Sequence, residues 1–130
     1  MGLFVPETFT SHSGLELHWK IECDALTASD WECLAIMGAS LVPPFRRVIG
    51  VPRGGWPFAN ALEQYVDETA DMWLIVDDVW TTGASVIEFE KQFTAEERST
   101  CNRLMAFNRS QAALPWRTYA ILDVHNRITP

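Results

Sequence analysis

Short apolar segments recur along this chain at intervals that suit the strands of one sheet. They lie at residues 48–51, 73–76, 103–107 and 119–122. Largely apolar segments of this length are typical of strands that are buried on both faces. From residue 48 onward they alternate with helical patterns, so we expect an α/β fold with a mostly parallel sheet and helices on both faces.

The helical segments have apolar residues three or four positions apart. The first follows Ser29 and Glu32, which have the spacing of a capping box, and it ends before Pro43. The second contains Pro57 in its first turn, where proline is favoured. The third follows Gly83, a residue that permits a tight turn between a strand and a helix.

Residues 1–26 form a lead-in to the α/β core, which we place at residues 27–125. Apolar and polar residues alternate at 15–20, as in a strand with one buried face. Two interpretations fit this segment. It is either a half-buried edge strand, which we prefer, or a cap whose His12, Ser13 and Lys20 overhang a binding site.

The composition predicts one soluble domain spanning residues 1–130. The chain is 48% hydrophobic and 21% charged, with a formal net charge of −7. This charge argues against a nucleic-acid-binding protein, which normally carries a basic face. The sequence contains neither an apolar segment near the roughly 20 residues that span a bilayer nor a secretory signal. Together with three widely spaced cysteines, which suggest free thiols, these features predict a cytoplasmic protein.

Two adjacent carboxylates, Asp77 and Asp78, follow the apolar segment 73–76. Carboxylates at the end of a buried strand need partners such as hydroxyls, a cation or metal-bound water. The small residues of the next turn are Thr81, Thr82, Gly83, Ala84 and Ser85. Backbone N–H groups and hydroxyls at such a turn, just before a helix, can bind phosphate. We therefore prefer a ligand site here to a pair of solvated acids.

A second glycine turn follows the strand predicted at 48–51. It contains Arg53, Gly54 and Gly55, directly before a helix. Adjacent glycines let backbone amides approach a ligand closely, and arginine is a bidentate donor for phosphate. In an open α/β sheet, such turns gather at the carboxyl ends of the strands, where ligands bind. The two turns are therefore expected to share one site.

These residues resemble those of type I phosphoribosyltransferases. Residues 73–85 are similar to the family's motif for phosphoribosyl pyrophosphate (PRPP), which has four apolar residues, two acids, two apolar residues and a hydroxyl-rich glycine loop. Residues 48–55 resemble its pyrophosphate-binding loop. Residues 9–14, followed by Lys20 and Asp24, are similar to the N-terminal hood of the orotate phosphoribosyltransferases.

The resemblance implies a role for each matching residue. Asp77 and Asp78 would hold the ribose hydroxyls, directly or through Mg²⁺-bound water, and residues 81–85 would hold the 5′-phosphate. Arg53, Gly54 and Gly55 would face the pyrophosphate, with Mg²⁺ as the cofactor. Asp77, Asp78 and Lys20 are the candidates for catalysis. The implied reaction transfers the phosphoribosyl group of PRPP to a nitrogenous base, and a homodimer is possible by analogy.

Several positions depart from the family's pattern. Orotate-type members have a long mobile loop with a catalytic lysine or arginine between the pyrophosphate-loop helix and the PRPP motif. Here that interval is residues 56–72, and its last part, 67–71, is acidic. His12 stands where the orotate enzymes tend to have lysine. Trp80 is bulkier than the usual aliphatic residue, and we expect it to pack in the core rather than to narrow the site.

Two functions remain open on this reading. One is a small phosphoribosyltransferase that acts on PRPP and a base. The other is a catalytically inactive module that binds PRPP or a nucleotide and lacks the catalytic loop. Arg109 is expected to be solvated, and the six tryptophans are expected mostly in the core or at interfaces.

Overall fold

In a computed structural model of the protein, residues 2–10 and 16–124 are described. The strands are β1 (Phe4–Thr10), β2 (Glu16–Ile21), β3 (Arg47–Gly50), β4 (Trp73–Trp80), β5 (Cys101–Asn108) and β6 (Thr118–Asp123). The α-helices are α1 (Ala28–Leu41), α2 (Trp56–Leu62), α3 (Ala84–Glu90) and α4 (Ala95–Ser99). Two 3₁₀ turns, η1 (Cys23–Ala25) and η2 (Glu63–Tyr65), complete the elements. Within the described residues, no helix has both the length and the apolar character needed to cross a membrane.

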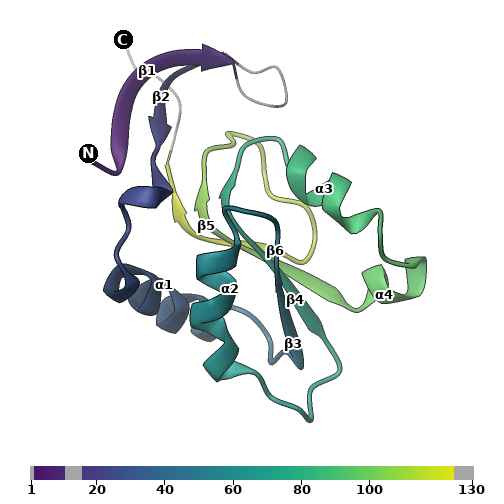
Figure 1. The fold of residues 1–130 in the computed structure, drawn as a ribbon. Coiled ribbons are helices and arrows are strands. Elements are labelled where there is room, and N and C mark those ends of the chain that lie inside the picture. The colour runs from purple at the N-terminus through teal and green to yellow at the C-terminus, as the bar shows by residue number, and fades with distance from the viewer. Residues whose placement is uncertain (1, 11–15, 125–130) are drawn as a thin grey trace.

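The main sheet has the order β3-β4-β5-β6, and all its neighbouring strands are parallel. Helices α1 and α2 cover one face, and α3 and α4 lie on the other (Figure 1). Each face has its own buried cluster, with Phe58 and Leu104 on the first and Ile75 and Met105 on the second. The predicted α/β architecture is confirmed, because strands buried on both faces require helices on both sides.

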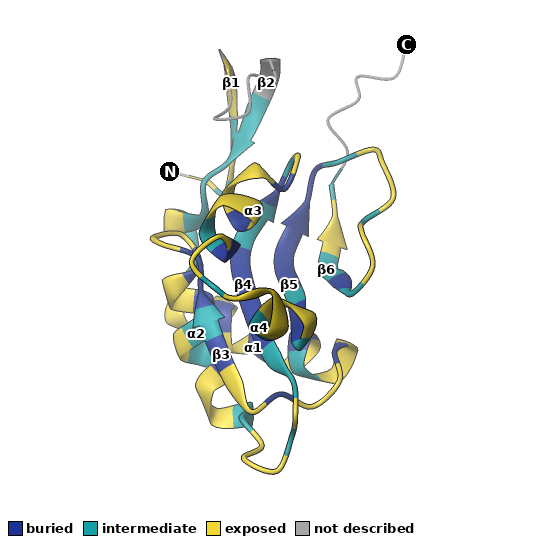
Figure 2. Ribbon diagram, turned by 90° about the vertical axis from the view of Figure 1, so that its right-hand side faces the viewer, coloured by how far each residue is buried: buried dark blue, intermediate teal, exposed yellow. Residues whose placement is uncertain are grey.

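The register brings the ends of the strands to one edge. Gly50 pairs with Val76, and Trp80 pairs with Asn108. The arrows of β3 to β6 all point toward the end of the molecule that carries β1 and β2 (Figure 2). The turns after β3 and β4 therefore both leave the sheet at this carboxyl edge, as the sequence predicts.

The first helix begins two residues earlier than the predicted capping box implies. The Thr27 hydroxyl accepts a hydrogen bond from the Asp30 N–H at 3.1 Å, and the Asp30 carboxylate accepts one from the Thr27 N–H at 2.9 Å. The capping box is thus Thr27 with Asp30, and the box predicted at Ser29 and Glu32 is wrong. Aspartate closes the box as glutamate would, because either carboxylate can reach back to the N-cap amide.

The N-terminal segment is a two-stranded antiparallel hairpin, which we call the hood. The alternation at 15–20 corresponds to β2, and its partner β1 was not predicted. The register shifts between Pro6 and Phe9, and proline there cannot donate a ladder hydrogen bond. In Figure 1 the hood lies outside the main sheet, at the carboxyl edge of its strands. His12 lies outside the described residues.

Candidate functional site

The acid pair lies inside β4, which continues to Trp80 rather than ending at residue 76. The Asp77 side chain accepts a hydrogen bond from the Asp78 N–H at 2.8 Å, and the Asp78 side chain accepts one from the Val79 N–H at 2.7 Å. Successive residues of a strand point to opposite faces. Asp77 accordingly lines a hollow with residues 81–85, whereas Asp78 lines a second cavity beneath the hood.

Asp77 is the more deeply buried of the two acids. Asp77 is only 6% exposed to solvent. Burial, followed by the neighbouring Asp78 carboxylate, raises the pKa of Asp77 to about 8. The pair therefore holds a proton near neutral pH. A ligand that offers hydroxyl donors or a cation would favour the ionised form, which binds those groups better.

The turn after β4 forms a small hollow at the start of α3. It is lined by Asp77 and by the residues from Val79 to Val86. Gly83 has a φ of 83°, a left-handed conformation that side chains rarely adopt. The Ile87 N–H donates to the Gly83 carbonyl at 2.9 Å and so starts the helix directly after the turn. The amides of the turn are thus held at the mouth of a helix, as a phosphate-binding loop requires.

Trp80 packs in the core, as predicted. It is 4% exposed and belongs to the cluster on the α3 side of the sheet. A Cβ atom at Gly83 would lie 2.3 Å from the Trp80 ring. The indole therefore forms the floor of the turn, and glycine is required there for space as well as for its φ.

The turn between β3 and α2 lies directly against the acid pair. A Cβ atom at Gly54 would lie 2.4 Å from Oδ2 of Asp78. Gly55 is enclosed by backbone, with the Val76 carbonyl oxygen 2.6 Å from the position of a Cβ atom. The peptide bond between Pro52 and Arg53 is cis. The structure thus places the first glycine turn against Asp78, whereas residues 81–85 line a separate hollow with Asp77. That the two turns share one site stays a prediction.

A cavity of about 340 Å³ opens between this turn and the hood. The residues that line it come from both the core and the hood: Ile21, Glu22, Cys23, Asp24, Trp31, Arg53, Gly54, Pro57 and Asp78. Burial, followed by the nearby Asp78, raises the pKa of the Cys23 thiol, which stays protonated. A cap formed by His12, Ser13 and Lys20 stays a prediction, because His12 and Ser13 lie outside the described residues and Lys20 does not line this cavity.

Lys20 forms ion pairs with two neighbouring carboxylates. Its ammonium group lies 3.5 Å from Glu7 and 3.4 Å from Glu22. Glu7, followed by Glu22, raises the pKa of Lys20. Glu22 also lines the cavity beneath the hood, so Lys20 lies one ion pair away from it. A catalytic role for Lys20 stays a prediction.

Arg109 is buried, and its predicted place in solvent is wrong. The residue is 4% exposed, and the carbon at the centre of its guanidinium lies 3.7 Å from the centroid of the Trp19 ring. Its N–H donates to the Trp80 carbonyl at 2.8 Å. Burial lowers the pKa of Arg109. The only feature of the sequence that pointed to the burial of Arg109 was its position directly after β5, the strand beside β4.

The carboxylates have the donor chemistry that a magnesium ion bound mainly through a ligand would use. Carboxylate oxygens of Asp77 and Asp78 are the hard donors that Mg²⁺ prefers. Within the described residues, no group of three or more His, Cys, Asp or Glu side chains is arranged to hold a metal. An ion that keeps several waters and binds one or two carboxylates together with ligand phosphates is compatible with this donor set.

The comparisons with known proteins address the fold. No protein-family model and no curated protein matches this sequence. Among solved structures, the orotate phosphoribosyltransferase of Aeropyrum pernix aligns with a TM-score of 0.70 at 22% identity, over 94% of this chain and 89% of that one. The Mycobacterium tuberculosis enzyme in complex with PRPP aligns with a TM-score of 0.59 at 16% identity, over 92% and 88%. This chain has the type I phosphoribosyltransferase fold.

A third neighbour places this fold within a longer protein. The UMP synthase of Leishmania donovani aligns with a TM-score of 0.74 at 18% identity, over 94% of this chain. The chain spans about a third of that protein's length, since the alignment covers 34% of it. The resemblance drawn from the motifs at 73–85 and 48–55 is thus confirmed at the level of the type I phosphoribosyltransferase fold.

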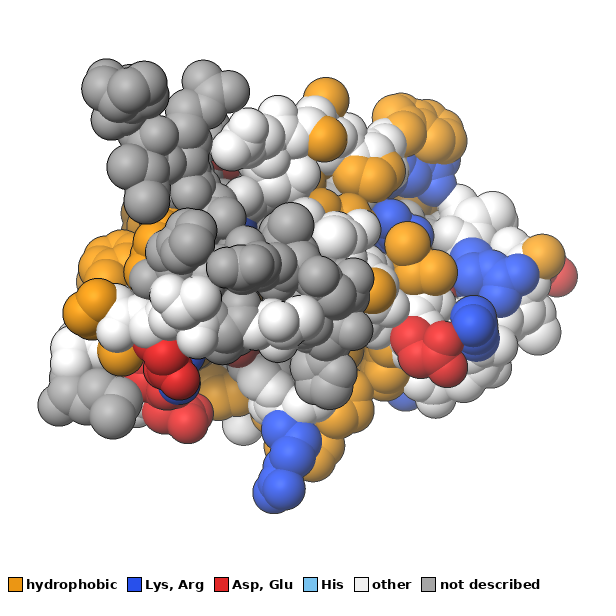
Figure 3. Space-filling model, turned by 90° about the horizontal axis from the view of Figure 1, so that it is seen from above, with side chains coloured by type: hydrophobic (Ala, Val, Ile, Leu, Met, Phe, Trp, Pro, Cys, Tyr) orange, Lys and Arg blue, Asp and Glu red, His pale blue; other side chains and the backbone are white. Residues whose placement is uncertain are grey.

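The hood end of the molecule mixes acidic, basic and hydrophobic side chains on its visible surface (Figure 3). Acidic groups stand beside basic ones there. The described residues on this face therefore carry charges of both signs.

Proposed function

We propose that this protein binds PRPP, or a nucleotide that carries ribose 5-phosphate, together with Mg²⁺. On this proposal it transfers the phosphoribosyl group to a nitrogenous base and releases pyrophosphate. The observation that carries it is the contact between the first glycine turn and the acid pair: Gly54 lies against the Asp78 carboxylate. A site for phosphate alone would need one turn, whereas PRPP carries phosphates at both ends of its ribose.

The proposed roles follow from where each group lies. Residues 81–85 would hold the 5′-phosphate in the hollow at the start of α3. Asp77 and Asp78 would accept hydrogen bonds from the ribose hydroxyls. Arg53 and Gly54 would face the pyrophosphate across the cavity beneath the hood. Fixed charges and donors at both ends of the sugar position its reactive carbon for substitution.

The reaction would be a substitution at C1 of the ribose. A ring nitrogen of the base forms a bond to C1, the bond from C1 to the pyrophosphate oxygen breaks, and that oxygen leaves with the electron pair. The nitrogen gives up its proton to solvent or to a base. A bound Mg²⁺ would supply charge neutralisation for the departing pyrophosphate.

Arg109 favours a base with an acidic group. It follows β5, so it leaves the sheet at the same edge as Asp77 and Asp78, and it lies under Trp19 of the hood. A guanidinium matches the planar geometry of a carboxylate. Orotate, the base named in several structural neighbours, carries a carboxylate and is the first acceptor to test.

A second function, binding without turnover, is favoured by the place of the acidic link. The Asp67 N–H donates to the Phe45 carbonyl, and the Arg46 N–H donates to the Met72 carbonyl, so both ends of the link lie beside the start of β3. That is the amino edge of the sheet, opposite the acid pair. Residues 67–72 therefore cannot close over the site as a catalytic loop would.

Calorimetric titration of PRPP with and without Mg²⁺ tests binding, and pyrophosphate release with orotate and a panel of other bases tests turnover. We expect saturable, Mg²⁺-dependent binding. Binding without release on any base would exclude the transferase and leave the binding module. Absence of PRPP binding would exclude both.

A matched pair of variants assigns the binding to this site. Asp78→Asn removes a charge from the cavity, whereas Asp71→Asn removes an exposed acid from the link at the opposite edge. We expect about a tenfold or greater loss of affinity for the first, because a hydrogen bond to a charged group contributes roughly 1.5–3 kcal/mol. The second should leave affinity unchanged.

A further inference from the structure

A second sizeable cavity lies away from the acid pair. Its volume is about 470 Å³, within the range of small-molecule sites. It is formed by α4, the start of β5 and the turn before β6, on the side of the sheet that α3 covers. None of its lining residues lines the hollow at residues 81–85 or the cavity beneath the hood.

Three of the eight residues that line the cavity are arginines. Arg98, Arg103 and Arg117 face it together with a single carboxylate, that of Glu90. Arg103 binds Glu90 through two nitrogens, at 2.9 and 2.5 Å, and the pair is neutral. Arg98 and Arg117 therefore add positive charge to this cavity in a protein whose net charge is −7. A local positive charge inside a concave surface concentrates the field and attracts anions.

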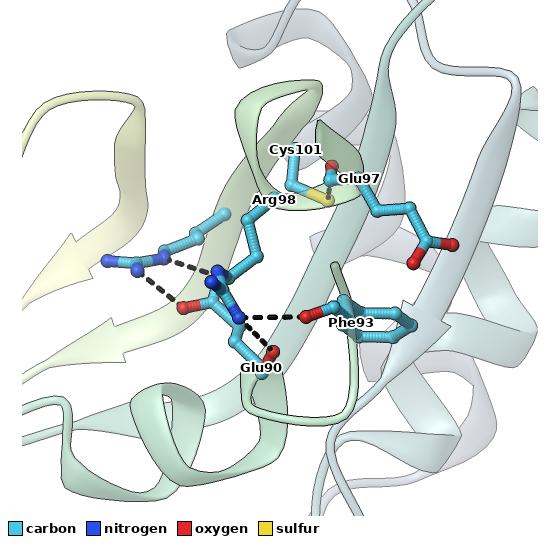
Figure 4. Close-up of polar contacts among 6 residues, drawn as sticks. Glu90, Phe93, Glu97, Arg98 and Cys101 are labelled. Carbon is cyan, nitrogen blue, oxygen red and sulfur yellow. Dashed lines mark hydrogen bonds and ion pairs between the residues drawn. The ribbon is translucent and has the colours of Figure 1, made fainter. Parts of the chain in front are cut away.

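The two remaining guanidinium groups are held in place. Nη1 of Arg98 donates to the Phe93 carbonyl at 2.8 Å and to the Glu90 carbonyl at 3.4 Å (Figure 4). Nη1 of Arg117 donates to the Ser99 carbonyl. Each of these bonds uses one nitrogen, whereas a guanidinium carries five N–H donors. Both groups are thus oriented while donors remain for a ligand.

An exposed tryptophan stands at the same cavity. Trp116 is 84% exposed. The Arg117 guanidinium lies 4.3 Å from the centroid of its ring. Arg117 itself has a φ of 61°, a conformation that is unfavourable for a residue with a side chain. The turn therefore presents an indole and a guanidinium side by side. The exposure of Trp116 and the positive φ of Arg117 are both unfavourable by themselves.

We propose that this arginine cavity is a second anion-binding site, for a phosphorylated ligand of mononucleotide size that carries an aromatic ring. The phosphate would bind Arg98 and Arg117, which match its oxygen atoms bidentately. The ring would stack on Trp116, since an aromatic base stacks on an indole face. The neutral pair of Arg103 and Glu90 forms the inner wall. This site is independent of the proposed PRPP site.

Nuclear magnetic resonance of the Trp116 indole N–H tests this proposal at the cavity itself. The resonance is assigned by its loss in Trp116→Phe, which leaves the other five tryptophans in place. The probes are AMP, adenosine and inorganic phosphate. We expect AMP to shift this resonance saturably, and adenosine and phosphate each to bind at least tenfold more weakly. AMP bound only at the acid pair would leave this resonance unchanged.

Two arginine variants make the test specific. Arg117→Gln should weaken the AMP-induced shift about tenfold, the loss expected for one charge-assisted phosphate contact. Arg47→Gln is the control, because Arg47 is exposed and, like Arg117, lies over an indole, 5.0 Å from the Trp73 centroid. It should leave AMP affinity unchanged. Equal losses in the two variants would show a general charge effect and overturn the proposal.

A measurement on the unmodified protein covers the case in which Arg117→Gln fails to fold. AMP affinity at the Trp116 resonance should fall as NaCl rises from 50 to about 500 mM, because salt screens charge pairs that water can reach. Adenosine should show no such dependence. No shift with AMP, salt-independent AMP binding, or adenosine binding as tight as that of AMP would each overturn the proposal, whatever the outcome of the PRPP titration.

Discussion

The turn after β3 and the turn after β4 look alike in sequence but differ in what their glycines do. Both follow a parallel strand, both contain glycine and both lead into a seven-residue helix. Gly55 lies against backbone, with the Val51 and Val76 main chains closer than 3 Å to any added Cβ atom. Gly83 instead has a positive φ and lies on the Trp80 ring.

This difference separates the roles of the two turns. The first is closed by packing, and it places Gly54 against the Asp78 carboxylate. The second is open, and it leaves a hollow bordered by Asp77 and its own small residues. The first turn therefore packs its backbone against the acid pair, and the second leaves a hollow among its own small residues. The changes below test this division.

The largest effect is expected at Asp77, through pH. The pKa of an aspartate in an unfolded chain is near 3.8, and burial raises that of Asp77 to about 8 in the folded protein. Between these values the folded state binds a proton that the unfolded state lacks, so stability falls as pH rises from about 4 to about 8. Asp77→Asn stays neutral and should remove a loss of about 3–4 kcal/mol between pH 5 and pH 8.

Urea denaturation of both proteins at several pH values measures this effect. Asp71→Asn, an exposed acid outside the site, serves as the control and should retain the wild-type slope. A wild-type curve parallel to that of Asp77→Asn would show that Asp77 is already ionised in the folded protein.

The next largest effect is expected at the closed turn. Gly55→Ala places a methyl group 2.6 Å from the Val76 carbonyl oxygen and 2.7 Å from the Val51 nitrogen. Neither atom can move without loss of the hydrogen bond that joins them, the 2.8 Å bond from the Val51 N–H to the Val76 carbonyl. We expect a loss of about 3 kcal/mol, at the upper end of overpacking effects. Thermal or urea unfolding measures it, and a loss below about 1 kcal/mol would show that the turn is less closely packed than described.

Gly83→Ala should cost about 2 kcal/mol, from its left-handed φ and from displacement of the Trp80 ring. The two causes can be separated in a double-mutant cycle. In a Trp80→Leu background the ring contact is gone, so the same change should cost only about 1 kcal/mol. Equal costs in both backgrounds would mean that Trp80 does not support the turn.

The smallest effect on stability is expected at Gly54. A methyl group there meets the side-chain carboxylate of Asp78, which can rotate away, so Gly54→Ala should cost under about 1 kcal/mol. It should nevertheless weaken Mg²⁺-dependent PRPP binding about tenfold, since Asp78 is displaced. Unfolding and calorimetry on the same variant check both parts. Unchanged PRPP affinity would show that this turn does not contribute to PRPP binding.

The local patterns of the sequence predicted the core well. The segments at 48–51, 73–76, 103–107 and 119–122 became β3 to β6, because short apolar segments between turns have few alternatives to a buried parallel strand. The motifs at 48–55 and 73–85 identified the type I phosphoribosyltransferase fold. The predicted capping box failed by two positions, because Ser, Thr, Asp and Glu near a helix start offer overlapping pairings.

Contacts between distant segments were beyond the sequence. The pairing of β1 with β2, the burial of Arg109 under Trp19, and the meeting of three arginines at one cavity join residues that no local pattern relates. Sequence by itself determined that the strand, the acid pair and the glycine loop adjoin one another, since these residues are contiguous. Only the tertiary structure decided that Gly54 lies against Asp78 and that the acidic link lies at the opposite edge, because parallel strands carry successive turns to opposite ends of the sheet.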